Sequence, residues 1–196
     1  MSTLENSHLE TFLRTMLSRR SVMPKRLGEP GPTIEEVQAL VDCALTAPDH
    51  NQLKPWRLLM IPRTRRADLA EAFIAGKVRR NGNISDEEKE RERDKAASTP
   101  VMMALISQVV SNDPYVPVEE QYIAIGAALQ NILLGAHAME YGGIILSGNR
   151  VRDIEVREIL EMDAGEELIG FICLGSINKQ PKSVVRSRYT DVLNSL

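Results

Sequence analysis

Two arginines and a serine near the N-terminus have side chains that could bind a phosphate. Arg19, Arg20 and Ser21 follow a stretch whose apolar residues recur at helical spacing, from about Ser7 to Ser18. Two guanidinium forks and a hydroxyl within one short turn suit a phosphate monoester in a protein without a glycine-rich loop. The alternative interpretation is a solvated arginine pair that complements the dipole of the preceding helix.

Two further stretches suit a flat, polar ring system. Residues 47–56 form a polar loop with a proline near each end, and the loop contains His50, Gln52 and Lys54. Several hydrogen-bonding side chains on such a stiff loop could bind a polar ring, although a solvated connection would have the same composition. Residues 142–149 have glycines around a short apolar strand, so the backbone could approach a flat ligand closely.

Several other chemistries lack support in the sequence. It contains no G-x-x-x-x-G-K-[ST] loop, no G-x-G-x-x-G loop and no G-x-S-x-G elbow. Cysteines and histidines do not cluster at metal-ligand spacing, and we expect Cys43 and Cys173 to be buried thiols. The formal net charge of −3 disfavours nucleic acid as a partner. We therefore expect no metal and no protein nucleophile.

Helices and strands alternate around these motifs, which indicates a core sheet covered by helices. A capping box at Thr33 and Glu36 predicts the start of a second helix, which Pro48 ends. Its expected buried face consists of Ile34, Val37, Leu40, Val41, Ala44 and Leu45. The expected strands are residues 56–61, 101–110, 144–146 and 168–174. The second of these is apolar on both faces, so we expect it in the middle of a covered sheet.

Three other segments have unusual compositions. Residues 86–95 are all ionisable, with opposite charges at i,i+3 spacing, which favours a solvated helix that forms a mobile cover near the site. Residues 121–139 carry no charge and predict a buried helix of a protein interior, not a membrane span. A second copy would cover this helix along its small residues Gly126, Ala127, Gly135 and Ala138. The polar tail, residues 178–196, would lie across that partner.

The motifs together resemble the flavin-dependent nitroreductase family, in its compact subgroup of NAD(P)H nitroreductases. R-R-S, P-D-H-x-x-x-x-P-W and G-G-I-x-x-S-G occur here in that family's order, and the resemblance extends from about Leu9 to Val192. It implies an α+β fold with a central, mainly antiparallel sheet surrounded by helices. It also implies one FMN-binding domain over residues 1–196 and an intertwined homodimer with an FMN at each of two interface sites.

The resemblance also assigns residues to the cofactor. By position, the FMN-binding residues would be Arg19, Arg20, Ser21, His50, Gln52, Lys54, Lys95, Ile145, Leu146, Ser147, Arg186 and Arg188. Relatives usually carry Trp-Arg where this chain has Ile145 and Leu146, so a cationic contact near the cofactor is missing from the motif. Lys95 could equally belong to the solvated face of the charged helix.

The function implied by the resemblance is an FMN-dependent oxidoreductase. NADPH or NADH would donate a hydride, and a small nitroaromatic or quinone-like acceptor would receive it in a second, ping-pong step. A different flavin reaction (dehalogenation, dehydrogenation or flavin cleavage) and a non-catalytic flavin-binding protein are the alternatives. We expect no nucleic-acid or membrane partner and, because the N-terminus lacks the pattern of a secretory signal, a cytoplasmic location.

Overall fold

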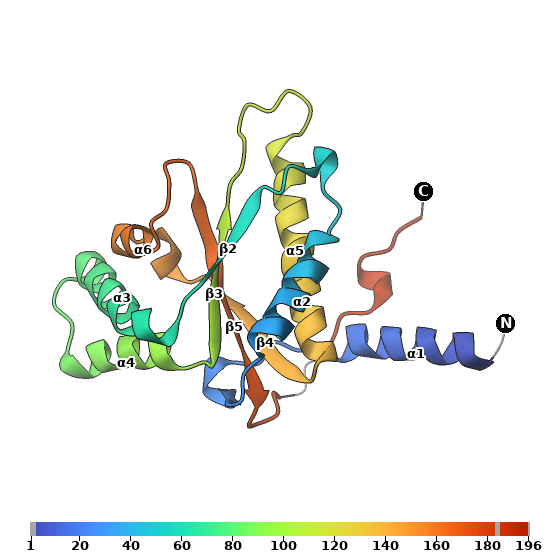
Figure 1. Cartoon of the computed structure of the whole chain (residues 1–196), viewed down its shortest axis with the longest axis horizontal. Coiled ribbons are helices and arrows are strands. Elements are labelled where there is room, and N and C mark those ends of the chain that lie inside the picture. Colours follow the sequence, from blue (N-terminus) through green and yellow to red (C-terminus); the bar gives the residue numbers. More distant parts are fainter. Residues whose placement is uncertain (1–2, 183–184, 196) are drawn as a thin grey trace.

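The computed structural model describes residues 3–182 and 185–195, and Figure 1 shows how its helices and strands are arranged. In chain order they are α1 (Thr3–Ser18), β1 (Leu27–Gly28), α2 (Ile34–Leu45), β2 (Trp56–Met60), α3 (Arg66–Asn81), α4 (Asp86–Ala97), β3 (Val101–Ser107), α5 (Val118–Ala138), β4 (Tyr141–Leu146), α6 (Ile154–Ile159) and β5 (Glu167–Ile177). Short 3-10 helices lie at Pro24–Arg26, His50–Gln52, Arg63–Arg65, Asn149–Arg152 and Tyr189–Asp191.

The five strands form one sheet in which β5 is bonded along both edges. β3 and β1 pair with one edge of β5, and β4 pairs with the other. β2 pairs with the outer edge of β3, and every one of these pairings is antiparallel. The expected α+β fold with a mainly antiparallel sheet is therefore confirmed.

Helices cover both faces of this sheet, α2 and α5 on one face and α3, α4 and α6 on the other (Figure 1). Alternate residues of β3 enter the two layers: Met102, Ala104 and Ile106 pack with one set of helices, and Met103 and Leu105 with the other. Burial of each large apolar side chain contributes about 1.5–3 kcal/mol. This two-sided burial explains why β3 has no polar face, as its sequence predicted.

The second helix begins at the predicted capping box, because Thr33 Oγ1 accepts from Glu36 N–H and Glu36 Oε2 accepts from Thr33 N–H. Its predicted buried face was too wide, since Ile34 and Leu45 are exposed. Only a narrow stripe of α2 faces α5, so the periodicity of apolar residues overestimated the covered arc. Cys43 is exposed on the same helix, contrary to expectation, whereas Cys173 is buried in β5.

Close contact between α2 and α5 depends on a glycine. A Cβ atom placed on Gly135 would lie 2.7 Å from Cδ2 of the fully buried Leu40, so a larger residue would force this leucine to shift within the core. Gly135 therefore allows close contact between two helices of the same chain. The contact with a second copy that the sequence suggested for Gly135 stays a prediction. Gly126 differs, because a Cβ atom placed on it would meet nothing within 4 Å.

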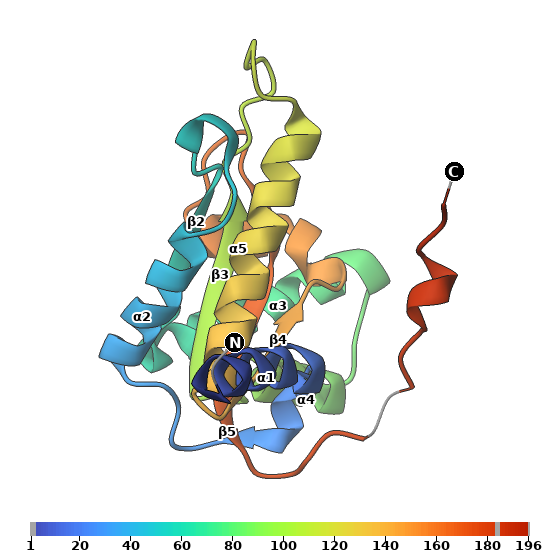
Figure 2. The same cartoon turned by 90° about the vertical axis from the view of Figure 1, so that its right-hand side faces the viewer.

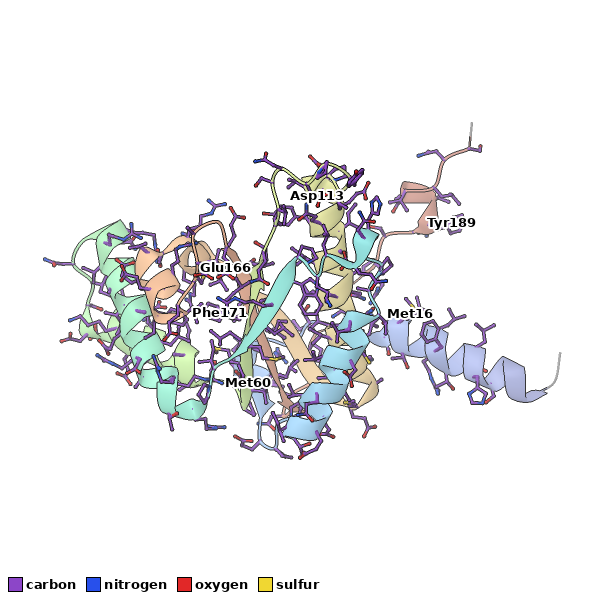
Figure 3. All side chains as sticks on the ribbon, turned by 45° about the horizontal axis from the view of Figure 1, so that its top comes forward. Met16, Met60, Asp113, Glu166, Phe171 and Tyr189 are labelled. Atoms are coloured by element: carbon purple, nitrogen blue, oxygen red, sulfur yellow. The ribbon has the colours of Figure 1, made fainter. Side chains whose placement is uncertain are left out.

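The two ends of the chain extend away from the body (Figures 1 and 2). Along α1 a stripe of apolar side chains is exposed: Leu9, Phe12, Leu13, Met16 and Leu17. The C-terminal segment also exposes apolar side chains, and Figure 3 shows Met16 and Tyr189 on these projecting parts. A contiguous apolar stripe of this kind is typical of a surface that another protein covers.

A buried carboxylate joins the start of β5 to the edge strand β2. Glu166 accepts hydrogen bonds from Nε and Nη2 of Arg57, both at 2.7 Å, and from Gln108 Nε2 at 3.0 Å. The backbone N–H of Asp163 donates a further bond at 2.9 Å. The hydrogen bond from Arg57 is the main reason that the pKa of Glu166 falls to about 2, even though burial opposes the shift. Figure 3 shows Glu166 inside the loop region between α6 and β5.

We expect Glu166→Gln to remove an acid-sensitive part of the stability. The pKa of Glu166 is lower in the folded chain than its ordinary value of 4.5, so the carboxylate stabilises the fold above about pH 4.5. This contribution, of order 3 kcal/mol, disappears as the pH falls towards 2. Urea unfolding at fixed protein concentration should therefore show the variant to be less stable at pH 7, with the difference shrinking at pH 3.

Glu158→Gln is the matched control, because Glu158 is an exposed carboxylate on the adjacent helix α6. It should leave the free energy of unfolding unchanged at both pH values. A difference between wild type and Glu166→Gln that stays constant from pH 7 to pH 3 would contradict this account.

Candidate functional site

The Arg-Arg-Ser motif lies against the free edge of β4. Ser21 forms a parallel bridge with Gly143, and Val22 N–H donates to the Gly143 carbonyl at 3.1 Å. Arg186, from the C-terminal segment, donates through Nη2 to the Arg19 carbonyl at 2.9 Å. Partial burial, followed by the positive charges of Arg186 and Arg20, lowers the pKa of Arg19. An anion bound here would relieve this repulsion.

Arg20 has a different role from Arg19. Its Nη1 donates to the carbonyls of Leu17 at 3.0 Å and Arg19 at 3.1 Å, at the C-terminal end of α1. Unsatisfied carbonyls gather at such an end, and a cation there is favourable. The motif thus divides its two arginines: Arg20 caps the helix, and Arg19 joins the group of cations with Arg186.

A pocket of about 480 Å³ opens where β4 ends. It is lined by Met23, Pro24, Lys25, Asp94, Lys95, Ser98, Leu146, Ser147, Gly148 and Arg150. Three of the predicted residues, Lys95, Leu146 and Ser147, are therefore brought together. Gly143, which holds Ser21, and Leu146 are three residues apart on β4, about 10 Å in a strand. The pocket and the Arg19 group thus lie along one strand.

Ile145 does not line this pocket. Its side chain packs with the core between the sheet and helices α2 and α5, against the position where Gly170 lacks a Cβ atom. Side chains alternate along a strand, so only one of the neighbouring pair Ile145 and Leu146 can point to the pocket. A role for Ile145 would be limited to its backbone.

Arg150 lines the pocket but does not belong to any of the sequence motifs. It follows Leu146 by four residues, in the 3-10 helix Asn149–Arg152. The motif has no cation at Leu146, but Arg150 supplies one to the same pocket. The only sequence signal was the pair of arginines directly after the glycine motif, and reading beyond the motif would have found it.

The loop with His50 lies far from the Arg19 group in the same chain. His50 Nδ1 is 2.8 Å from Glu120 Oε2 near the start of α5, whereas Ser18 Oγ is 2.8 Å from His137 Nε2 near its end. Glu120 and His137 are 17 residues apart on this helix, which corresponds to about 25 Å. A single chain therefore does not bring His50 to the Arg19 group.

The backbone of this loop is unusual. Asn51, Gln52 and Lys54 have φ values of 58°, 53° and 46°, in the left-handed region that non-glycine residues rarely adopt. Asp49 supports the conformation by accepting a hydrogen bond from Lys54 N–H at 2.7 Å. Strained backbone of this kind concentrates at binding sites, where it holds side chains in a fixed arrangement.

Arg188 is also outside the group formed within one chain. It lies on the projecting C-terminal segment, where its backbone N–H donates to Asp191 Oδ2 at 2.9 Å. Arg186, two residues earlier, contacts Arg19 instead. Of the two tail arginines that the sequence suggested, the structure places Arg186 beside the motif.

A larger pocket of about 560 Å³ lies between β2 and α6, and none of the predicted site residues lines it. Its wall includes Arg57, whose charge is already paired with Glu166. We therefore take the pocket at the end of β4 as the candidate site. Within the described residues there is no group of acidic, histidine and cysteine side chains that could hold a metal ion, and no helix both long and apolar enough to span a membrane.

Comparisons with known proteins identify the family and the fold. A family model described as Nitroreductase family matches residues 16–176. "Putative NAD(P)H nitroreductase YdjA" of Escherichia coli (strain K12) is 32% identical over 167 residues, 84% of this chain and 87% of that protein. Among solved structures, a nitroreductase-like family protein from Bacillus cereus has a TM-score of 0.78 at 22% identity, covering 94% and 95% of the two chains. The NADPH:FMN oxidoreductase from Vibrio harveyi, complexed with NAD+, has a TM-score of 0.71 at 20% identity, covering 94% and 76%.

We expect anion binding to raise the pKa of His137. Burial, followed by the charges of Arg19 and Arg20, lowers this pKa below its ordinary value of 6.5. An anion beside Arg19 would cancel the repulsive part of the shift. A titration of the histidine ring signals by NMR, with and without sulfate, should show the pKa of His137 rising with sulfate. Arg19→Gln should raise it without sulfate and weaken the response, whereas identical titrations with and without sulfate would contradict an anion site.

Proposed function

The chain belongs to the nitroreductase family and is therefore an oxidoreductase, and from this premise we propose that it binds FMN and transfers hydride from NADPH or NADH to a small acceptor. Nitroaromatic and quinone-like compounds are the proposed acceptors. The observation that carries the proposal is the alignment, along β4, of a cation group beside Ser21 and a pocket beside Leu146. Bound FMN would supply the hydride chemistry itself, since it accepts and donates hydride.

The residues present fit FMN by their chemistry. Arg19, Arg186 and the Ser21 hydroxyl are suitable donors for a single terminal phosphate. The pocket at the end of β4 combines an apolar surface from Met23 and Leu146 with cations, which suits a conjugated ring with polar edges. A dinucleotide such as FAD would need room for a second nucleotide, and the sequence lacks the G-x-G-x-x-G loop that often binds one.

We further propose that two copies complete each site. In one chain His50, Gln52 and Lys54 are about 25 Å from the Arg19 group, farther than one FMN extends. A second copy packed against α1 and the exposed face of α5 would cover the apolar stripe of α1 and Ile123. Its residues 47–56 would then reach the flavin of the first copy, and its tail would contribute Arg188. The whole chain, residues 1–196, would act as one FMN-binding domain in this homodimer.

The protein would bind, orient and tune the flavin without a nucleophile of its own. The pocket would hold the ring against the backbone of Ser147 and Gly148, and the cations of Lys95 and Arg150 would favour negative charge on it. Acceptors would reach the open face of the ring in the space that the nicotinamide leaves after hydride transfer.

The purified protein should be yellow, and the cofactor released by heat should run as FMN on chromatography. Under anaerobic conditions it should oxidise one equivalent of NADPH or NADH per bound FMN, and more than one equivalent only when a nitroaromatic or quinone is added. Finding FAD, or no flavin after reconstitution, would reject the proposal. Bound FMN without turnover would favour the alternative of a flavin-binding protein.

Mixed dimers test whether the site is shared. One chain carries Arg19→Ala and the other carries His50→Ala with Gln52→Ala, and two affinity tags isolate dimers with one chain of each. Loss of a charge-assisted hydrogen bond weakens binding by roughly tenfold or more, so each parent dimer should bind FMN poorly. In the mixed dimer one site carries all three substitutions and the other carries none. We therefore expect half the wild-type FMN content, whereas a mixed dimer as poor as its parents would place each site within one chain.

A further inference from the structure

A buried carboxylate lies in the middle of the charged helix α4. The Glu92 side chain is only 5% exposed, and its Oε1 is 2.7 Å from Lys95 Nζ and 3.6 Å from Lys77 Nζ. Its Oε2 accepts a hydrogen bond from Arg150 Nη2 at 3.0 Å. Burial raises the pKa of Glu92, but the hydrogen bond from Lys95 and the charges of Arg150 and Lys77 outweigh it, so the pKa is lowered. Glu92 is therefore ionised at neutral pH, and α4 is anchored to the body by charge.

Arg150 is fixed from two sides. Its guanidinium carbon lies 4.4 Å from the centroid of the Phe73 ring, an arrangement in which the cation is attracted to the face of the ring. Phe73 is itself held edge-on against Phe171 of β5, with ring centroids 5.5 Å apart at 77°. Figure 3 shows Phe171 within the body of the molecule. Glu92 and Phe73 thus fix both the position and the plane of the guanidinium.

Among the cations that line the pocket, Arg150 is the least accessible to solvent. Its side chain is 20% exposed, compared with 47% for Lys95, and Lys25 is an exposed residue. A charge shielded from water acts more strongly on a neighbouring ligand. A guanidinium has five N–H donors, and within residues 3–182 and 185–195 its hydrogen bond is the one to Glu92. Donors therefore remain for a ligand in the pocket.

We infer that Arg150 contacts the flavin in this pocket and stabilises its reduced form, and that Glu92 is the positioning residue that holds Arg150 there. The inference rests on the proposed function. Reduced flavin carries more negative charge than oxidised flavin, so a fixed, poorly solvated guanidinium binds the reduced form more tightly. The negative charge of Glu92 opposes this effect, because it partly cancels the field of Arg150 and Lys95. The two residues should therefore shift the flavin potential in opposite directions.

The test compares Arg150→Gln and Glu92→Gln in the full-length, FMN-loaded protein. The two-electron potential of bound FMN is measured anaerobically against a reference dye, and the affinity of oxidised FMN is measured by fluorescence titration. Arg150→Gln should weaken binding of reduced FMN at least tenfold more than binding of oxidised FMN, which lowers the potential by about 30 mV. Glu92→Gln keeps an oxygen acceptor but removes the negative charge, so it should raise the potential.

Arg152→Gln is the matched control, because Arg152 lies exposed in the same 3-10 helix as Arg150 and does not line the pocket. It should leave the potential unchanged. A merely structural role predicts that both test variants lower thermal stability without opposite shifts of potential, and that result would overturn the inference. If Arg150→Gln does not fold, Glu92→Gln decides alone, since an unchanged or lowered potential overturns it. Wild-type protein that binds no FMN would instead reject the proposed function.

Discussion

The rest of the structure depends on the position of β5. This strand is buried on both faces of the sheet and is hydrogen-bonded to neighbouring strands along both edges. Its backbone groups are satisfied by β3 and β1 on one side and by β4 on the other. Its side chains enter both cores, as Phe171 and Ile172 do. β4 carries the candidate pocket at its end, and Ser21 is attached through β4. A shift in the register of β5 would therefore move the whole site.

The two groups of cations along β4 differ in whether a carboxylate of the protein neutralises them. Partial burial, followed by the charges of Arg186 and Arg20, lowers the pKa of Arg19, so an anion at this group would reduce the unfavourable energy. The cations at the pocket face Glu92, which supplies negative charge from inside the protein. Under the proposed function, the first arrangement would suit the phosphate of FMN. The second would place cations whose charge is already partly balanced beside the ring.

Local chemistry in the sequence was enough to predict much of the fold. The capping box at Thr33 depends only on a residue three positions away. The apolar run of β3 shows directly that both faces of this strand are covered. The exposed Ile34 and Leu45 were mispredicted, because periodicity marks an apolar arc without showing how much of it another helix covers. Glu92 was missed for a related reason: in a run of charges, sequence alone does not show which side chain faces inward.

The site was predicted less completely, because it depends on contacts between distant segments. The motifs named Lys95, Leu146 and Ser147, and these do line one pocket. Nothing in the motifs indicated that His50 lies near the opposite end of α5 from Arg19, since spacing along the sequence does not show where distant segments meet in space. Arg150 belongs to none of the motifs, and its position is fixed by Phe73 and Glu92, which are distant in sequence.

The buried Glu92 also constrains how this sequence can change during evolution. Removing one partner of a buried ion pair costs about 3–5 kcal/mol, a large share of the stability of an ordinary domain. Loss of Arg150 alone would leave a buried acid with less compensation, and loss of Glu92 alone would leave cations crowded around an apolar pocket. Such single substitutions would be selected against. Glu92 and Arg150 should thus be inherited as a pair, and a lineage that loses one should replace the other as well.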